Sequence, residues 1–175
     1  MSTLYDRIVS QRGSLEKLVA KIPGFKGYQD KQARRTADRM LREHIAQMLH
    51  QKVDKLINIE KVILSNAGIS YMSKTRDVKG KLQLYHDKVA TAAPKYSGMW
   101  GQMKIGSEEL ERIYAFDEAQ ANYVESIDTA LEQLQQAALA NDGLDTAIFE
   151  LDGVITEAKQ AFDLRDDVIT ELGEI

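Results

Sequence analysis

The chain has 175 residues, enough for one domain, and it lacks cysteine, which excludes disulfides, thiolate metal sites and cysteine nucleophiles. Its formal net charge of −4 hides two opposed halves. Residues 1–100 hold 19 Lys or Arg against 9 Asp or Glu, whereas residues 101–175 hold 4 against 18. Such a split predicts a partner for each half, within the chain or between chains. No apolar run reaches the ~20 residues of a membrane-spanning helix, so we expect a cytoplasmic protein, or one that binds a membrane only at its surface.

The first predicted elements are a helix over 3–21 and a longer helix over 30–65. Good helix formers fill both segments, and apolar residues recur at helical spacing. Gly13 is a weak point of the first helix, and a turn with proline and glycine at 22–28 separates the two. Asp30 has the side chain of an N-cap. At 1.5 Å per residue the long helix would span about 50 Å, so it needs a long antiparallel neighbour to bury its apolar face.

Three further helices are predicted, over 70–92, 107–140 and 144–172. The segment 94–106 breaks the helical pattern, and Ser107 is a good cap for the helix that follows. Long helices joined by short turns favour an antiparallel bundle. The predicted fold class is therefore all-α, with one domain over 1–175, about five helices and one long helix at about 30–65.

Motifs of known catalytic chemistry are absent from the sequence. It has no glycine-rich nucleotide fingerprint, no phosphate-binding loop and no nucleophile elbow. A carboxylate-bridged di-metal site in a bundle needs Glu-x-x-His pairs, and none of His44, His50 and His86 has a Glu three residues before it. We therefore expect no catalytic residue, no metal and no cofactor.

Asp117 falls on the otherwise apolar stripe of the predicted helix 107–140. We expect it to lie at the edge of that stripe, where its carboxylate stays in contact with water. The alternative is a buried pair with a basic residue of the helices 30–65 or 70–92, because a buried carboxylate needs a cationic or hydrogen-bonding partner.

A basic face marks the start of the long predicted helix. Its members, spaced at i, i+4, i+8 and i+11 with one flanking residue, are Lys31, Arg35, Arg39 and Arg42, and Arg34. We expect them to pair with acidic residues of the two C-terminal helices, such as the stripe Glu111, Glu118, Glu125 and Glu132. A protein partner or a second copy of the chain is the next alternative. Phosphates of nucleic acid or lipid come third, because no set of stacking aromatic residues accompanies the run.

The segment 95–105 carries the only tryptophan of the chain. Tyr96, Met99 and Trp100 in a glycine-containing loop are typical of a docking surface or of a wedge for membranes. The alternative, which we favour, is a loop that plugs one end of the bundle.

Short motifs in both halves resemble a pattern in uncharacterised bacterial all-helical proteins. In the C-terminal half they are Tyr96-Ser97-Gly98-Met99-Trp100, Lys104-Ile105, Glu108-Glu109-Leu110 and Ile113-Tyr114-Ala115-Phe116-Asp117. In the N-terminal half Pro23-Gly24-Phe25-Lys26-Gly27-Tyr28 precedes Arg34-Arg35, Ala37-Asp38 and Arg42. The resemblance covers most of the chain and implies an all-helical fold without implying an activity.

The sequence therefore predicts a non-enzymatic bacterial scaffold or adaptor that self-associates through complementary basic and acidic faces. The candidate partner-binding residues are Lys31, Arg34, Arg35, Arg39, Arg42, Tyr96, Met99 and Trp100. The expected partner is a protein or a second copy of the chain, and nucleic acid is not expected. One alternative is a peripheral membrane-remodelling protein of ESCRT-III or phage-shock layout that binds anionic lipid, an analogy of layout alone. The other is an enzyme whose site carries no recognised motif.

Overall fold

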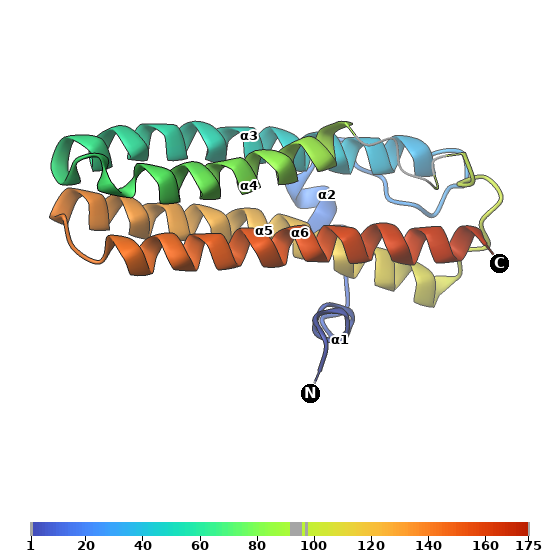
Figure 1. The fold of residues 1–175 in the computed structure, drawn as a ribbon. Coiled ribbons are helices and arrows are strands. Elements are labelled where there is room, and N and C mark those ends of the chain that lie inside the picture. Colours follow the sequence, from blue (N-terminus) through green and yellow to red (C-terminus); the bar gives the residue numbers. More distant parts are fainter. Residues whose placement is uncertain (1, 92–95, 97, 175) are drawn as a thin grey trace.

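The computed structural model describes residues 2–91, 96 and 98–174, and every regular element among them is helical. Four long helices form an elongated bundle (Figure 1). They are α3 (Arg34–Ala67), α4 (Met72–Thr91), α5 (Ser107–Ala140) and α6 (Leu144–Gly173). The predicted all-α fold with one long helix is thus confirmed. The structure adds that α5, with 34 residues, is as long as α3.

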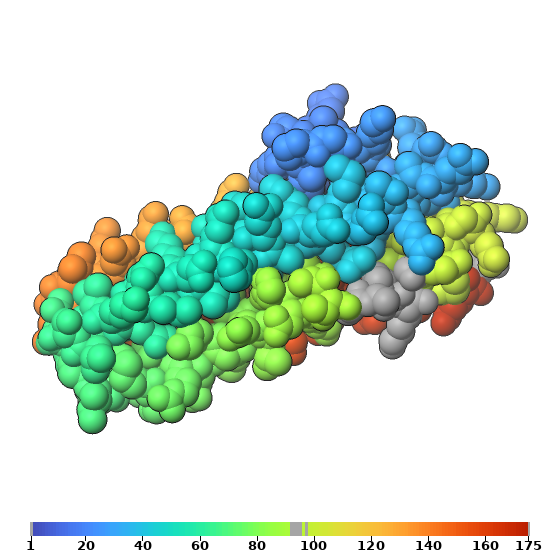
Figure 2. Space-filling view, turned by 90° about the horizontal axis from the view of Figure 1, so that it is seen from above, coloured from blue at the N-terminus to red at the C-terminus, as the bar shows by residue number. Residues whose placement is uncertain are grey.

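Two short helices and one turn complete the fold. Helices α1 (Leu4–Ser10) and α2 (Leu15–Lys21) pack against α5, and the 3-10 turn η1 (Ile69–Tyr71) links α3 to α4. Viewed from above, the N-terminal segment widens one half of an otherwise slender molecule (Figure 2). Among the described residues, none of the helices combines the length and the apolar character that a bilayer span requires.

The bundle consists of two antiparallel hairpins, α3–α4 and α5–α6, laid side by side. Helix α3 packs on α4 and α5, and α6 packs on α5 and α4. Between the hairpins the neighbouring helices run in the same direction. On α4 and α6, Lys74 pairs with Asp145 and Lys81 with Asp152, so residue numbers rise together on both helices. Each long helix therefore has one antiparallel and one parallel neighbour.

The core follows from the heptad-like spacing of aliphatic residues on all four helices. Leu49, Leu56 and Ile63 of α3 belong to one buried cluster with Leu82 of α4 and Leu131 of α5. Removing such side chains from water is the main driving force for packing amphipathic helices together. A smaller cluster around Phe116 lies beneath α1.

The predicted helix over 3–21 is wrong in one respect, because it is broken at Gly13. A Cβ atom at Gly13 would lie 2.0 Å from the backbone nitrogen of Ala115, so the chain passes directly against α5 at this point. That close approach needs a glycine and ends α1 before α2 begins.

The start of the long helix also differs from the prediction. Helix α3 begins at Arg34, whereas Asp30 lies in the preceding turn and accepts a hydrogen bond from the Gln32 amide. Helix α5 begins at Ser107, as predicted, but the N-cap position is taken by Gly106 and not by Ser107. There the Gly106 amide donates to the Glu109 carboxylate at 2.9 Å, and this bond satisfies one free N–H of the helix start.

Candidate functional site

The most unusual feature of the structure is a buried polar cluster centred on Arg165. Its guanidinium donates hydrogen bonds to Asp117 Oδ1 at 2.6 Å and to Asp38 Oδ1 at 2.8 Å. It also donates to the hydroxyls of Tyr96 at 2.9 Å and Tyr28 at 3.1 Å. The Arg165 side chain is 0% exposed. We call these five residues the Arg165 cluster.

Five separate segments supply the Arg165 cluster. Asp38, Asp117 and Arg165 come from α3, α5 and α6, and Tyr28 and Tyr96 come from the two irregular segments that precede α3 and α5. Arg165 falls on the buried stripe of α6, one turn from Phe162 and one turn from Ile169. Arg165 is therefore buried because its position on α6 follows the same helical spacing as the apolar core residues.

Tyr28 is held in place by its neighbours on both sides. Its backbone N–H donates to the Tyr114 hydroxyl at 3.0 Å, and its ring stacks on Trp100 with ring centroids 5.4 Å apart. The preceding Gly27 has a φ of +77°, a backbone conformation that glycine adopts without strain. The Tyr28 hydroxyl donates a hydrogen bond to Asp117 Oδ2 at 2.6 Å.

Arg34 ties the two irregular segments to each other. Its buried guanidinium donates to the carbonyl oxygens of Tyr28 at 2.8 Å and of Met103 at 2.9 Å. A third bond goes to the Trp100 carbonyl at 3.2 Å. One side chain thus donates hydrogen bonds to three backbone carbonyls of the two segments.

Burial dominates the electrostatics of the Arg165 cluster. It raises the pKa of Asp117 above its ordinary value, against the opposing attraction of Arg165. Burial alone would lower the pKa of Arg165, but the attraction of Asp117, the two tyrosines and Asp38 outweighs it and raises that pKa. The pKa values of Tyr28 and Tyr96 are raised as well, again chiefly by burial. Both hydroxyls therefore stay protonated and can donate to the carboxylates.

Two neighbouring side chains, Arg42 and Asp166, complete the hydrogen bonding of the Arg165 cluster. The second oxygen of Asp38 accepts from Arg42 at 3.0 Å, and the Tyr96 hydroxyl lies within hydrogen-bonding distance of Asp38 and of Asp166. Each charged group has a partner and none of the five side chains faces solvent. A satisfied buried network of this kind makes the packing rigid and specific. Among the described residues, no group of three or more potential metal ligands is gathered together.

Asp117 shows where reasoning from the sequence failed. It is fully buried, whereas we expected it to stay in contact with water. Its cation comes from α6, in the acidic half, and neither of the basic helices considered in advance supplies it. A signal was present, because Arg165 is one of only four cations in residues 101–175 and falls on an apolar stripe, as Asp117 does.

The predicted basic face does not form one surface. Lys31 lies in the turn before α3 and is exposed, as are Arg35 and Arg39. Arg34 is buried, and Arg42 is partly buried against Asp38. The five residues therefore serve different roles, and three of them remain at the surface.

The expected partners of that face pair with other cations. Glu118 pairs with Lys17 at 3.4 Å and Glu125 with Lys21 at 3.4 Å, both from α2. Glu132 pairs with Lys55 at 3.7 Å, farther along α3. Within one chain, these three acids therefore do not meet the start of α3 as predicted. The reason is that α2, which the sequence placed within one longer helix, lies on α5 instead. Glu111 forms no ion pair with a described residue, and pairing between two chains stays a prediction.

In the loop before α5, predicted as either a plug or a docking surface, the described aromatic side chains are buried. Trp100 is 2% exposed and Tyr96 is fully buried, while Met99 is partly exposed and lies close to Gly173. Positions 95 and 97 of this loop lie outside the described residues. The indole N–H of Trp100 has no acceptor in the described part of the chain. In this conformation the loop covers one end of the bundle.

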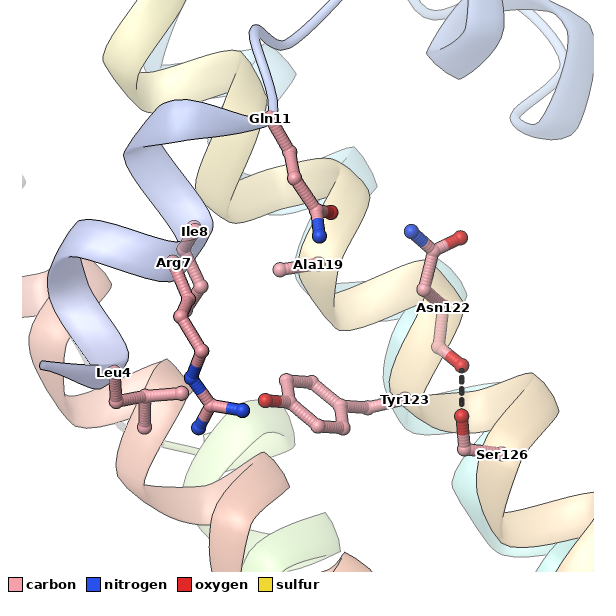
Figure 3. Close-up of a pocket in the computed structure, with 8 residues that line it drawn as sticks. All are labelled: Leu4, Arg7, Ile8, Gln11, Ala119, Asn122, Tyr123 and Ser126. Carbon is pink, nitrogen blue, oxygen red and sulfur yellow. Dashed lines mark hydrogen bonds between the residues drawn. The ribbon is translucent and has the colours of Figure 1, made fainter. Parts of the chain in front are cut away.

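A small open pocket lies between α1 and α5 (Figure 3). Leu4, Arg7 and Ile8 line one side and Tyr123 and Ser126 the other, around a cavity of about 190 Å³. Arg7 is engaged in an ion pair with Glu157 of α6. Burial and the nearby Glu157 carboxylate raise the pKa of Tyr123 to about 12. Arg7 and Tyr123 of this pocket thus interact with Glu157 of the same chain.

No protein-family model, curated protein or solved structure matches this chain. The resemblance to bacterial helical proteins therefore remains a prediction.

Proposed function

We propose that the protein is a non-enzymatic helical scaffold or adaptor. The observation that supports this most is the Arg165 cluster, whose five side chains are withdrawn from solvent and join five segments of the chain. A catalytic site must admit a substrate to its polar groups, whereas these groups are buried and bind one another, Arg42 and Asp166. The arrangement suits a protein that must keep one shape while it is bound by others.

The charges of the two halves meet largely within one chain. Lys52 and Lys55 of α3 both contact Asp128 of α5, at 3.0 and 2.9 Å. On the other side of the bundle, Lys74, Lys81 and Lys88 of α4 pair with acidic residues of α6. These ion pairs join the two hairpins of one chain, so the charges involved are not available for self-association.

Opposite charges nevertheless remain exposed near the covered end of the bundle. Lys31 and Arg35 form no ion pair among the described residues, and Arg39 pairs only with Glu43 of its own helix, at 3.8 Å. Near the C-terminal end of α6, Asp167 and Glu171 are exposed as well. Self-association of the scaffold would join these basic and acidic surfaces of two copies.

Light scattering during size-exclusion chromatography tests self-association. We expect a mass above the 19.7 kDa of one chain at low salt and dissociation at 1 M salt, since screening shortens the Debye length from about 30 Å to about 3 Å. The double variant Arg35→Glu, Arg39→Glu should abolish the larger species, while Lys159→Glu, an exposed site on α6, should not. A mass of one chain under all conditions would refute self-association and leave only an adaptor for another protein.

A peripheral membrane protein is the second candidate function. The exposed cations Lys31, Arg35 and Arg39 could bind anionic lipid headgroups. The wedge of such a membrane protein, however, would have to be Trp100, which is buried in this conformation. Co-sedimentation with anionic vesicles separates the two candidates. Sedimentation that the double variant abolishes would favour the membrane, and absence of sedimentation would favour the scaffold.

A further inference from the structure

One open surface of the hairpin α5–α6 is not covered by any helix that the structure describes. It is a groove of about 490 Å³ between the two helices. Its main lining residues are Ala130 and Gln133 of α5 with Phe149, Glu150, Gly153 and Val154 of α6. We call it the Phe149 groove.

The Phe149 groove is apolar at its floor and open to solvent. Phe149 is 78% exposed, which is unusual for a large aromatic side chain on a helix. Gly153, one turn further on, leaves the floor empty, because a Cβ atom built there would meet no atom within 4 Å. Ala130 on the facing helix is also small. A large ring beside two small residues forms a shape that can receive a side chain from outside.

Next to the Phe149 groove, the same two helices, α5 and α6, already bind a short helix of this chain. Helix α1 packs on α5 and α6 and sets Ile8 in the cluster of Phe116 and Val168. Its Arg7 forms an ion pair with Glu157. Ser126, at the edge of the α1 pocket (Figure 3), also lines the Phe149 groove, so the two sites adjoin. The surface between α5 and α6 thus binds a short amphipathic helix, α1, whose Arg7 pairs with a carboxylate of α6.

Charge restricts what can fill the remaining part. The lining contains two carboxylates, Glu150 and Glu157, and no cation. Glu157 already has Arg7, whereas Glu150 forms no ion pair with any described residue. Two copies joined face to face through this groove would set carboxylates against carboxylates, which is unfavourable. A cationic partner is favoured instead.

From these observations we infer that the Phe149 groove binds a short amphipathic helix of another protein. Its apolar side chains would pack on Phe149 and Val154, and a Lys or Arg would pair with Glu150, as Arg7 of α1 pairs with Glu157. The inference rests on the proposed adaptor function and specifies its partner surface. It uses the helix-in-groove mode of recognition, in which anchors recur every three or four residues.

A pair of labelled synthetic peptides tests this assignment. The first is a 14-residue amphipathic helix with leucines on one face and lysines on the other, and the second carries glutamates in place of the lysines. Fluorescence anisotropy should give a Kd of about 10–100 μM for the lysine peptide, the range of weak helix docking, and at least tenfold weaker binding of the glutamate peptide. NMR amide shifts should change mainly on α5 and α6 around residues 126–133 and 149–157.

Variants of the full chain locate the site. Phe149→Ala and Glu150→Lys should each weaken binding of the lysine peptide at least tenfold. Two matched controls should stay within about twofold: Leu84→Ala, which removes a 64%-exposed side chain of α4, and Glu111→Lys, which makes the same charge change near the start of α5. All four positions face solvent or lie at the surface, so thermal melts should confirm that the fold is kept.

Several outcomes would overturn the inference. They are equal loss of binding in Glu111→Lys, shifts confined to α1 and its own contacts, and absence of binding to the wild-type chain. A fall in mass on Phe149→Ala in light scattering would assign the groove to a second copy instead. Self-association that persists while no peptide binds would leave the scaffold standing and remove only the groove.

Discussion

Arg165 is the single residue on which most of the polar structure depends. Its guanidinium offers five N–H donors in a planar fork and makes four hydrogen bonds with them, to groups from four other segments. Such a geometry cannot be reproduced by a lysine, which carries a point charge on a flexible stem. The cost of burying a guanidinium is offset only while its partners are all present.

Removing Arg165 should therefore destabilise the protein strongly. In Arg165→Met, Asp117 and Asp38 lose a buried cation, and we expect the free energy of unfolding to fall by about 3–5 kcal/mol. Arg165→Lys should fall between this variant and the parent. Urea denaturation followed by circular dichroism measures these differences. Lys159→Ala, an exposed position on the same helix, should change stability by less than about 0.5 kcal/mol.

Alanine substitutions at two glycines should change the stability of the protein in opposite directions. Gly13→Ala places a methyl group 2.0 Å from the α5 backbone, so the N-terminal segment must move away, and we expect a loss of about 1–3 kcal/mol. Gly80 lies inside α4 with no atom within 4 Å of a built Cβ. Gly80→Ala should therefore raise stability by about 0.5–1 kcal/mol through backbone entropy. Thermal melts that shift in the same direction for both variants would contradict this reading of the two sites.

At the scale of elements, the two irregular segments before α3 and α5 act as one cap. Tyr28 stacks on Trp100, the Trp100 ring meets the edge of Tyr96, and Arg34 binds carbonyls of both segments. The bonds from Arg34 to the carbonyls of Trp100 and Met103 span 66 and 69 positions of the chain. The cap seals the end of the bundle above the Arg165 cluster.

Trp100→Ala should accordingly loosen the cap and cost about 3–5 kcal/mol, as truncation of a large buried aromatic does. Because Trp100 is the only tryptophan, its fluorescence reports on this cap alone. The parent should show the blue-shifted emission of a buried indole, and the red shift on unfolding should coincide with the loss of helix. A variant as stable as the parent would show that the ring contributes nothing to the cap.

Helix positions could be predicted from the sequence because they depend on local periodicity. The Ser107 start of α5 and the turn at Asn141 were both visible in that way. The break at Gly13 was not, because it depends on contact with Ala115, about 100 residues away. Likewise, the site of Asp117 depended on Arg165, 48 residues on, and neither residue reveals the other without the fold.

At the scale of the whole molecule, ion pairs at the surface join the two hairpins on both sides. Asp128 is the best placed of them, since it accepts from Lys52 and from Lys55. Hydrogen bonding from Lys55 is the main cause that lowers the pKa of Asp128, and Lys52 adds to it. The lowered pKa means that the folded state holds the ionised form more tightly than the unfolded state does.

The contribution of Asp128 should therefore depend on pH. It is fully present above the ordinary aspartate pKa of 3.8 and is lost as pH falls through the lowered pKa of the folded state. Asp128→Asn should thus lower stability at pH 7 by about 0.5–1.5 kcal/mol and by much less near about pH 2. Urea titrations at the two pH values measure the difference. As a control, Glu111→Gln, which removes an exposed carboxylate without an ion pair among the described residues, should change stability at pH 7 by less than about 0.5 kcal/mol.

The sequence separations within the Arg165 cluster bear on how the chain folds and unfolds. Each hairpin is built from neighbouring stretches and can form early, whereas the cluster unites residues 48 to 137 positions apart. Contacts that close after the rate-limiting step have little influence on the folding rate and instead slow unfolding. We therefore predict that the cluster slows unfolding of the assembled bundle. In stopped-flow experiments Arg165→Lys should speed unfolding and leave refolding nearly unchanged.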